Sequence, residues 1–215
     1  MSKKIILLAG PTASGKSKLA IHLAKKINGE IINADSMQVY KEFSILSSRP
    51  NKNEIKQAKH YLYGLISVKK YFSAGDWLSE VKKNINLCFN KKKIPIIVGG
   101  TGLYFNTITK GISKIPDIDI KTRNKVRNLF RKLGFAKFYK ELLKLDPKVK
   151  NKILATDSQR VQRAYEVKLK TKKSLYDWIA NTKSDFVDYD IKKIFIDIPR
   201  DELLKKISKR TELMF

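Results

Sequence analysis

The stretch of sequence that decides the predicted fold spans residues 10–17 and reads Gly10-Pro11-Thr12-Ala13-Ser14-Gly15-Lys16-Ser17. It matches the phosphate-binding loop pattern G-x-x-x-x-G-K-[ST] in full. An apolar run, Ile5 to Ala9, precedes it, and apolar residues at helical spacing follow it from Lys16 to Ile27. Because a strand before and a helix after are the setting that this loop requires, we predict a loop that binds at least two linked phosphates.

The residue types of the loop explain this chemistry. Glycines allow the backbone to curl so that its N–H groups point inward, and the start of a helix adds positive potential. Lys16 can reach the outer phosphate oxygens, and Ser17 can ligate Mg²⁺, so we predict Gly10 to Ser17 as the phosphate site and Mg²⁺ as a cofactor. The loop leaves open whether the phosphates belong to ATP or to another diphosphate.

Two more turns follow predicted strands. Asp35 comes directly after the strand Glu30 to Ala34, and Gly99-Gly100-Thr101-Gly102 follows the strand Ile94 to Val98. In an open parallel sheet the carboxyl ends of the strands form the ligand-binding edge. Asp35 is thus placed to act on whatever approaches the phosphates, or is a solvent-facing turn residue, and Thr101 is placed to donate to a phosphate oxygen.

The pattern along the chain predicts an α/β fold with an insertion. Alternating strands and helices up to residue 112 indicate a parallel sheet covered on both faces, as in P-loop NTPases. From 113 to 190 the periodicity is helical and cations are frequent, which indicates a basic all-helical insertion. Residues 191–215 return to the core, with a strand at Lys193 to Ile198 and the start of a helix after it.

Charge is the strongest compositional signal. The 215 residues include 46 Lys and Arg against 20 Asp and Glu, a formal net charge of +26. Such a field favours polyanions such as RNA, although lysines that only solvate the surface would give the same count. The apolar runs are too short for a membrane span or a signal peptide, so we expect a cytoplasmic protein that does not enter a membrane.

The single cysteine and the two histidines suggest no chemistry. Cys88 lies on one apolar helix face, so we expect a buried structural thiol. His22 and His60 are far apart and have no acidic or thiol partners at metal-ligand spacing, which gives a zinc site little support.

Four strings together carry a family resemblance: GPTASGKS (residues 10–17), NADSMQVYK (33–41), GGTGLYF (99–105) and DSQRVQRAYEV (157–167). In this order and at these separations the chain closely resembles the bacterial tRNA dimethylallyltransferase (isopentenyltransferase) family over essentially its whole length. The resemblance implies a P-loop core with a helical insertion. It also implies transfer of dimethylallyl from its diphosphate to N6 of the adenosine 3′ of the tRNA anticodon.

The resemblance implies roles for individual residues. Asp35 is the expected general base, and Lys16 and Thr101 are the expected catalytic partners at the diphosphate. The expected contacts with the tRNA anticodon stem-loop are Asp35, Ser36, Met37, Gln38, Thr101, Arg123, Gln159, Arg160, Val161, Gln162 and Arg163. Without the family, the 159–163 segment would be interpreted as a solvated helix face.

The chain departs from the family pattern in two places. Where the family usually has YKGLDIGTAKP, residues 40–50 read YKEFSILSSRP, which keeps basic and hydroxyl character but changes the loop. The chain also stops at Phe215, inside a helix that the family continues, so it is either a fragment or a shortened form. Which tRNAs are substrates is open, and a monomer is the default expectation.

Two other functions compete with this interpretation. A P-loop small-molecule kinase would use Lys16 to hold ATP and Asp35 to activate a substrate hydroxyl, but leaves the basic insertion unexplained. A nucleotide-switched RNA-binding protein explains the charge and the loop without covalent chemistry.

Overall fold

The computed structural model describes residues 3–212 and residue 214. The chain divides into two compact units, one made of Met1–Thr109 with Ser184–Phe215 and the other of Lys110–Lys183. Each unit has its own buried apolar cluster, so each is described by itself.

The first unit contains one parallel sheet of five strands in the order β3-β2-β4-β1-β5. The strands are β1 Lys4–Ala9, β2 Gly29–Asn33, β3 His60–Tyr61, β4 Ile94–Gly99 and β5 Asp190–Phe195. The register pairs Ala9 with Gly99, and Asn33 with Val98. The carboxyl ends of β1, β2 and β4 therefore meet at one edge, and the predicted α/β class is confirmed.

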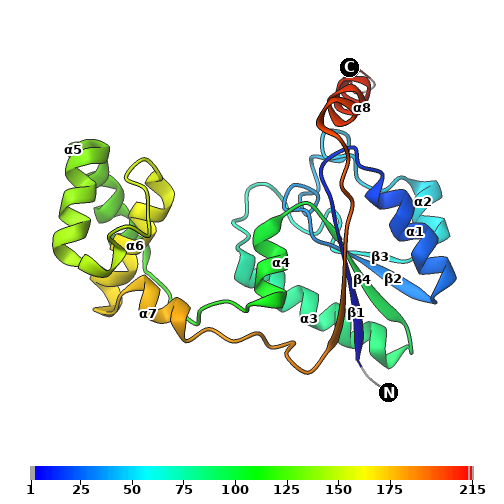
Figure 1. Cartoon of the computed structure of the whole chain (residues 1–215), viewed down its shortest axis with the longest axis horizontal. Helices are drawn as coiled ribbons and strands as arrows, with labels where there is room; N and C mark the ends of the chain where they lie inside the picture. Colours follow the sequence, from blue (N-terminus) through cyan, green and yellow to red (C-terminus); the bar gives the residue numbers. More distant parts are fainter. Residues whose placement is uncertain (1–2, 213, 215) are drawn as a thin grey trace. The chain divides into compact units, whose positions relative to one another are not determined.

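Helices cover both faces of this sheet (Figure 1). On one face, α1 (Lys16–Lys26) packs with the region of α2 (Lys52–Gln57) over apolar residues of the sheet. On the other face, α3 (Ala74–Asn90) and α4 (Gly102–Thr109) bury a larger cluster. Apolar residues from both sides of β1, β2 and β4 are buried, which explains why these strands read as almost continuous apolar runs.

The last strand and helix correct the predicted positions. We expected a strand at residues 193–198, but β5 ends at Phe195 because its ladder is set by β1, whose Lys4 pairs with Asp190. The helix α8 spans Arg200–Glu212 and has no buried residue. The short elements α2, β3, α4 and α7 were not predicted, because segments of so few residues give too little periodicity to detect.

The second unit is helical. It contains α5 (Ile120–Leu145), the 3₁₀ turn η1 (Pro147–Val149), α6 (Ser158–Thr171) and α7 (Leu175–Ala180). Gly134 has φ 70° and divides α5 into two helical halves, as a glycine with left-handed φ does readily. The buried cluster of this unit includes Val126, Phe138 and Val161.

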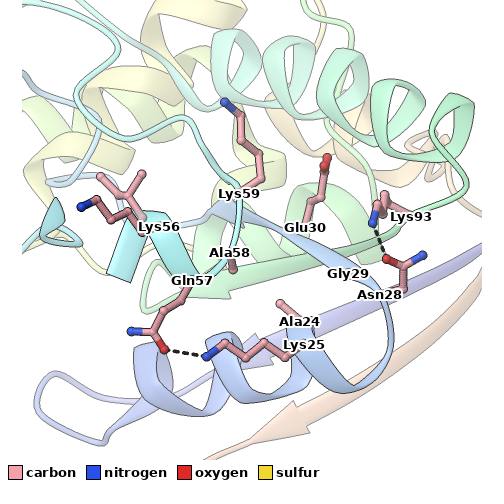
Figure 2. A pocket seen from close by; sticks show the side chains of 11 residues that line it. Ala24, Lys25, Asn28, Gly29, Glu30, Lys56, Gln57, Ala58, Lys59 and Lys93 are labelled. Carbon is pink, nitrogen blue, oxygen red and sulfur yellow. Dashed lines mark hydrogen bonds between the residues drawn. The ribbon is translucent and has the colours of Figure 1, made fainter. Parts of the chain in front are cut away.

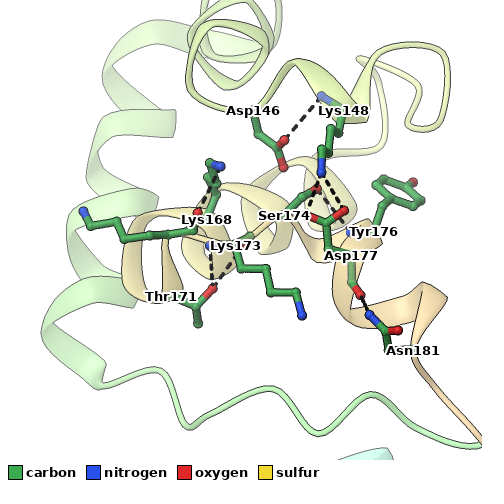
Figure 3. Close-up of polar contacts among 10 residues, drawn as sticks. Asp146, Lys148, Lys168, Thr171, Lys173, Ser174, Tyr176, Asp177 and Asn181 are labelled. Carbon is green, nitrogen blue, oxygen red and sulfur yellow. Dashed lines mark hydrogen bonds and ion pairs between the residues drawn. The ribbon is translucent and has the colours of Figure 1, made fainter.

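Polar contacts hold the turns of this unit (Figure 3). Lys148 of η1 donates to both carboxylate oxygens of Asp177 in α7, at 2.9 Å each. Ser174 caps the start of α7, and Asp146, which is 1% exposed, accepts from the Lys148 N–H at 3.3 Å. These contacts join η1 to α7 on the surface of the helical unit.

The helical unit ends before the predicted boundary at residue 190. Phe186 is 4% exposed and lies in the apolar cluster of the first unit, where its ring contacts Tyr189. Lys82 of α3 also pairs with Asp185. Residues 184–190, which we assigned to the insertion, thus pack with the sheet, because a buried aromatic residue decides the boundary rather than the local helical pattern. None of the described helices has the length and apolar character needed to cross a membrane.

Candidate active site

The loop between β1 and α1 has the geometry of an anion site. Ala13 and Gly15 take positive φ, 61° and 81°, which curls the backbone between the strand and the helix. Gly15 is the N-cap of α1 and supplies no side-chain cap, and the first turn of the helix carries no acidic residue. The N–H groups at this end are therefore not occupied by a capping side chain, and their partial positive charge favours a phosphate.

Two side chains of the loop, those of Lys16 and Ser14, are placed to bind a ligand. The Lys16 ammonium donates to the Pro11 carbonyl at 3.0 Å, so it is folded back over its own loop. The Ser14 hydroxyl is buried and has no hydrogen-bond partner among the described residues. Because burying an unpaired hydroxyl is unfavourable, Ser14 fits a ligand that completes its hydrogen bonding.

The electrostatics place two other charged groups near Lys16. Burial lowers the pKa of the Lys16 ammonium; the Asp35 carboxylate acts in the opposite direction, and Arg210 adds to the lowering. Asp35 follows β2, whereas Arg210 belongs to α8, so residues distant in the sequence share one electrostatic site. We did not predict Arg210, and only the packing of the chain reveals it because no local motif surrounds it.

Only one of the two carboxylate oxygens of Asp35 accepts a hydrogen bond from a described residue. One carboxylate oxygen, Oδ1, accepts from the Met37 N–H at 3.0 Å, while no described residue donates to Oδ2. The other oxygen is thus available to accept a proton from a bound group. Met37 itself is 52% exposed, and its flexible apolar side chain suits contact with a base.

Thr101 ties the turn after β4 to the turn that carries Asp35. Its hydroxyl oxygen accepts from the Ser36 N–H at 2.9 Å and lies 3.3 Å from the Ser36 hydroxyl, to which it donates. The Thr101 N–H donates to the Ala34 carbonyl at 3.2 Å. In this arrangement the Thr101 side chain positions Ser36, and donating to a phosphate would require its hydrogen to turn away from the Ser36 hydroxyl.

Gln38 is also engaged with its own chain. Its side-chain amide donates to the carbonyls of Ser47 and Ser48 at 2.7 and 3.1 Å. These bonds hold the 43–49 turn, which lies in the part of the chain that departs from the family pattern. Gln38 thus supports the wall of the site, and its amide oxygen is the group left for contact with a nucleotide.

The predicted tRNA-contacting residues of the insertion lie on α5 and α6. Arg160 is exposed, with a side chain 77% accessible and 3.2 Å from Asp157. Arg163 is 40% exposed and lies 3.7 Å from Glu166, while the Arg123 Nε donates to the Ile118 carbonyl at 3.1 Å. Val161 is 1% exposed and packs in the core, so its side chain holds α6 in place. Gln159 is exposed, whereas the half-buried Gln162 donates its amide to the Ser158 carbonyl at 3.1 Å.

A cavity of about 400 Å³ lies elsewhere on the first unit, between the end of α1 and α2 (Figure 2). It opens at Gly29, the amino end of β2, whereas the phosphate loop follows the carboxyl end of β1. Two of its lysines bind neutral side chains, Lys25 the amide of Gln57 at 2.7 Å and Lys93 that of Asn28. We place the active site at the carboxyl edge, since ligands of open α/β sheets bind there.

Cys88 and His60, the other reactive side chain types of the sequence, have surroundings that fit a structural role. Cys88 is fully buried, and burial raises the pKa of its thiol to about 12, so it is not a thiolate nucleophile at neutral pH. Burial lowers the pKa of His60, whose ring lies 2.8 Å from the Ala58 carbonyl. No group of three or more His, Cys, Asp or Glu side chains suited to a metal ion occurs among residues 3–212 and 214.

Comparison with known proteins identifies the family of the chain. Residues 38–215 match the family model described as IPP transferase. The tRNA dimethylallyltransferase of Pelagibacter ubique (strain HTCC1062) is 57% identical over 211 residues, which is 98% of this chain and 67% of that protein. That of Rickettsia massiliae (strain Mtu5) is 42% identical over 214 residues, 99% of this chain and 59% of that protein.

Solved structures agree. A eukaryotic dimethylallyltransferase acting on tRNA is similar with a TM-score of 0.84 at 30% identity, covering 99% of this chain and 53% of that one. A tRNA isopentenylpyrophosphate transferase from Staphylococcus epidermidis gives a TM-score of 0.61 at 33% identity, covering 98% of this chain and 69% of that one. The chain thus spans about half to two thirds of the length of these proteins. The relatives support the transferase interpretation over the kinase, and the chain belongs to the IPP transferase family of tRNA dimethylallyltransferases.

Proposed function

We propose that this chain transfers a dimethylallyl group from dimethylallyl diphosphate to N6 of the adenosine 3′ to a tRNA anticodon, and releases diphosphate. The observation that carries the proposal is the meeting of the phosphate loop, Asp35 and Thr101 at the carboxyl edge of one sheet. Membership of the IPP transferase family supports it, because the relatives are named for this activity.

The diphosphate of the prenyl donor occupies the phosphate loop in this proposal. The uncapped start of α1, the Lys16 ammonium and the unpaired Ser14 hydroxyl are donors for its oxygens, and Arg210 adds positive charge. As the allylic C–O bond breaks, its electron pair stays with the diphosphate. Fixed hydrogen-bond donors stabilise this developing charge more than water does. Such electrostatic stabilisation is the largest single contribution to the rate enhancement of many enzymes.

Asp35 completes the reaction at the adenine. The N6 amine forms the new C–N bond to the allylic carbon and must lose a proton, because its lone pair is delocalised into the ring and the alkylated amine would otherwise stay positive. The Oδ2 oxygen of Asp35 accepts this proton, since no described residue donates to it. A base positioned within hydrogen-bond reach contributes about 10²–10⁴ in rate.

The residues present fit a magnesium ion held mainly by phosphate and water oxygens. Mg²⁺ prefers oxygen ligands and commonly binds through one or two carboxylates plus substrate phosphates. The Ser17 hydroxyl lies on the exposed first turn of α1, and the Asp35 carboxylate is close enough to raise the pKa of Lys16. When bound, Mg²⁺ would neutralise charge on the diphosphate, and Ser17 is the residue we expect to hold it.

The tRNA is the acceptor in this proposal, and the basic helical unit is its binding surface. The net charge of +26 favours RNA, and Arg160 presents an exposed guanidinium on α6. A base inside the anticodon loop must leave its stack to reach Asp35. The exposed Met37 provides an apolar surface for that base beside the carboxylate.

One experiment separates the proposal from both alternatives. The full chain is incubated with dimethylallyl diphosphate and unmodified tRNA, and the tRNA is weighed by mass spectrometry. Gain of one dimethylallyl group supports the transferase. No mass gain contradicts it, and filter binding of the same tRNA then separates the alternatives: binding retained supports a nucleotide-switched RNA-binding protein, and no binding supports a kinase. The cytoplasmic location, the binding of ATP and the monomeric state stay predictions from the sequence.

A further inference from the structure

Asn33 is a buried polar residue that the reaction described above does not use. It is the last residue of β2 and is 0% exposed. An unpaired amide in such a place would cost free energy, whereas an apolar side chain of similar volume would not. The hydrogen bonds of Asn33 therefore indicate what the amide is there to hold.

The Asn33 side chain binds the backbone of Asp35 on both sides. Its Oδ1 accepts from the Asp35 N–H at 2.8 Å, and its Nδ2 donates to the Asp35 carbonyl at 3.0 Å. The second Nδ2 hydrogen goes to the Leu62 carbonyl, 3.1 Å away and just after β3. The turn that carries Asp35 is thus fixed to two neighbouring strands through one amide.

Asn33 is itself held by a residue of the helices that pack on the sheet, Trp77 of α3. The indole Nε1 of Trp77, a fully buried residue of α3, donates to the Asn33 carbonyl at 2.9 Å. The Trp77 ring stacks on Tyr104 of α4 with centroids 4.1 Å apart. The chain of contacts runs from the packed core through Asn33 to Asp35, which gives the carboxylate a rigid support.

Asparagine is the side chain that meets these requirements. It has an acceptor and a two-hydrogen donor at the same distance from the backbone, which match one N–H and two carbonyls. Aspartate would set a second oxygen against the carbonyls of Asp35 and Leu62, and serine has only one hydrogen to donate. The structure assigns Asn33 as a positioning residue that fixes the peptide of Asp35, so that the free Oδ2 meets the adenine amine.

This inference rests on the proposed function, because it takes Asp35 as the base. A base that shifts by roughly 1 Å can lose about 10²-fold in rate. The Asn33→Ala and Asn33→Asp variants of the full chain should therefore lose about 10- to 100-fold in kcat while pyrophosphate inhibits them as in the wild type to within about threefold. Thr107→Val is the matched control, since Thr107 is 2% exposed and donates one buried hydrogen bond to the Tyr104 carbonyl, at 2.8 Å.

The kinetic outcomes decide between positioning and mere stability. Loss of kcat in both Asn33 variants, with pyrophosphate inhibition retained and Thr107→Val unaffected, supports the assignment. An unchanged kcat overturns it. So does a loss of pyrophosphate affinity in step with kcat, because that would show a general collapse of the sheet edge.

Amide hydrogen exchange by NMR tests the same contact without activity or a folded variant. In the wild type the Asp35 N–H should exchange slowly, like the Ala34 N–H, which donates to the Val98 carbonyl at 2.7 Å. If Asn33→Ala folds, only the Asp35 amide should lose this protection. Fast exchange of Asp35 in the wild type overturns the assignment. If the wild type transfers no prenyl group, the proposed function fails, and the exchange rates still decide whether Asn33 holds Asp35.

Discussion

Gly99 lies directly against the carbonyl of Ala34: a Cβ atom at Gly99 would be 2.1 Å from both the carbonyl carbon and the carbonyl oxygen. Gly99 ends β4, and Ala34 is the residue before Asp35. The missing side chain therefore lets two strand ends approach, and the approach allows Thr101 to bind Ser36 at 2.9 Å. The Gly-Gly turn of the sequence is explained by this contact rather than by flexibility.

Gly99→Ala should destabilise the protein and disturb the site. The contact is with backbone, which cannot turn aside, so we expect a loss of about 1–3 kcal/mol in the free energy of unfolding, as for other overpacked sites. Urea denaturation measures it. Gly102→Ala is the control, because a Cβ there meets nothing within 4 Å. Equal stability of the two variants would show that β2 and β4 do not approach as described.

Lys16→Ala should weaken diphosphate binding, because the ammonium is the one loop side chain that can swing from the Pro11 carbonyl to an outer phosphate oxygen. Calorimetric titration with inorganic pyrophosphate measures the affinity. Lys18→Ala removes the same charge from an exposed position of the same helix and should leave the affinity within about twofold, as exposed charges contribute little. If both variants bind alike, the loop is not the diphosphate site.

Asp35→Asn should reduce prenyl transfer by about 10²–10⁴, the usual contribution of a general base. The amide keeps the shape and can still accept from the Met37 N–H, so tRNA binding should stay within a few-fold. Single-turnover transfer and filter binding of tRNA separate the two effects. Near-normal turnover would remove Asp35 from the mechanism.

Arg123→Ala, Arg160→Ala and Arg163→Ala should each weaken tRNA binding and flatten its salt dependence by roughly 0.7–0.9 in log–log slope per lost phosphate contact. Lys144→Ala removes an exposed cation of α5, paired with Glu141, and serves as the charge control. If an arginine reads a base instead, discrimination between tRNAs should relax while the slope stays constant. Unchanged affinity, slope and discrimination in all three would show that this surface does not bind RNA.

Arg163→Ala should also destabilise the helical unit, whereas Arg160→Ala should not. The partner of Arg163, Glu166, has a side chain only 10% exposed, while that of Asp157, the partner of Arg160, is 33% exposed. Removing Arg163 leaves a nearly buried carboxylate without its cation, which is unfavourable. Thermal unfolding of the two variants checks this, and equal midpoints would contradict it.

Asp119 should make the helical unit sensitive to acid. A hydrogen bond from Lys170, and then hydrogen bonds from Thr122, hold the pKa of the Asp119 carboxyl below its ordinary value of 3.8. Because the folded pKa is the lower one, this stabilisation is present above pH 3.8 and is lost as the pH falls toward the folded pKa. Over the same pH range the midpoint temperature of thermal unfolding should fall less for Asp119→Asn than for the wild type. Parallel plots of midpoint against pH for the two proteins would contradict the pairing.

The sequence by itself determined the α/β class and the family, and it predicted the phosphate loop. The loop pattern is local, since residues 10–17 and the flanking strand and helix carry all of its chemistry. Short apolar strands are likewise visible as apolar runs, and the helical spacing of apolar residues predicts a helix at Ala74 to Phe89, which the structure shows as α3 at Ala74–Asn90. Asp35 directly follows β2, and ligands bind at the carboxyl ends of parallel strands, so the sequence alone predicted Asp35 at the ligand-binding edge.

Only the tertiary structure decided the contacts between distant segments. The hydrogen bonds of Asn33 with Leu62 and Trp77, the closeness of Gly99 to Ala34 and the charge of Arg210 near Lys16 join residues from different elements. The end of β5 at Phe195 and the boundary at residue 184 also depend on partners, the ladder of β1 and the buried Phe186. Sequence patterns report the local backbone and one face of an element, whereas pairing and burial depend on what the folded chain brings beside it.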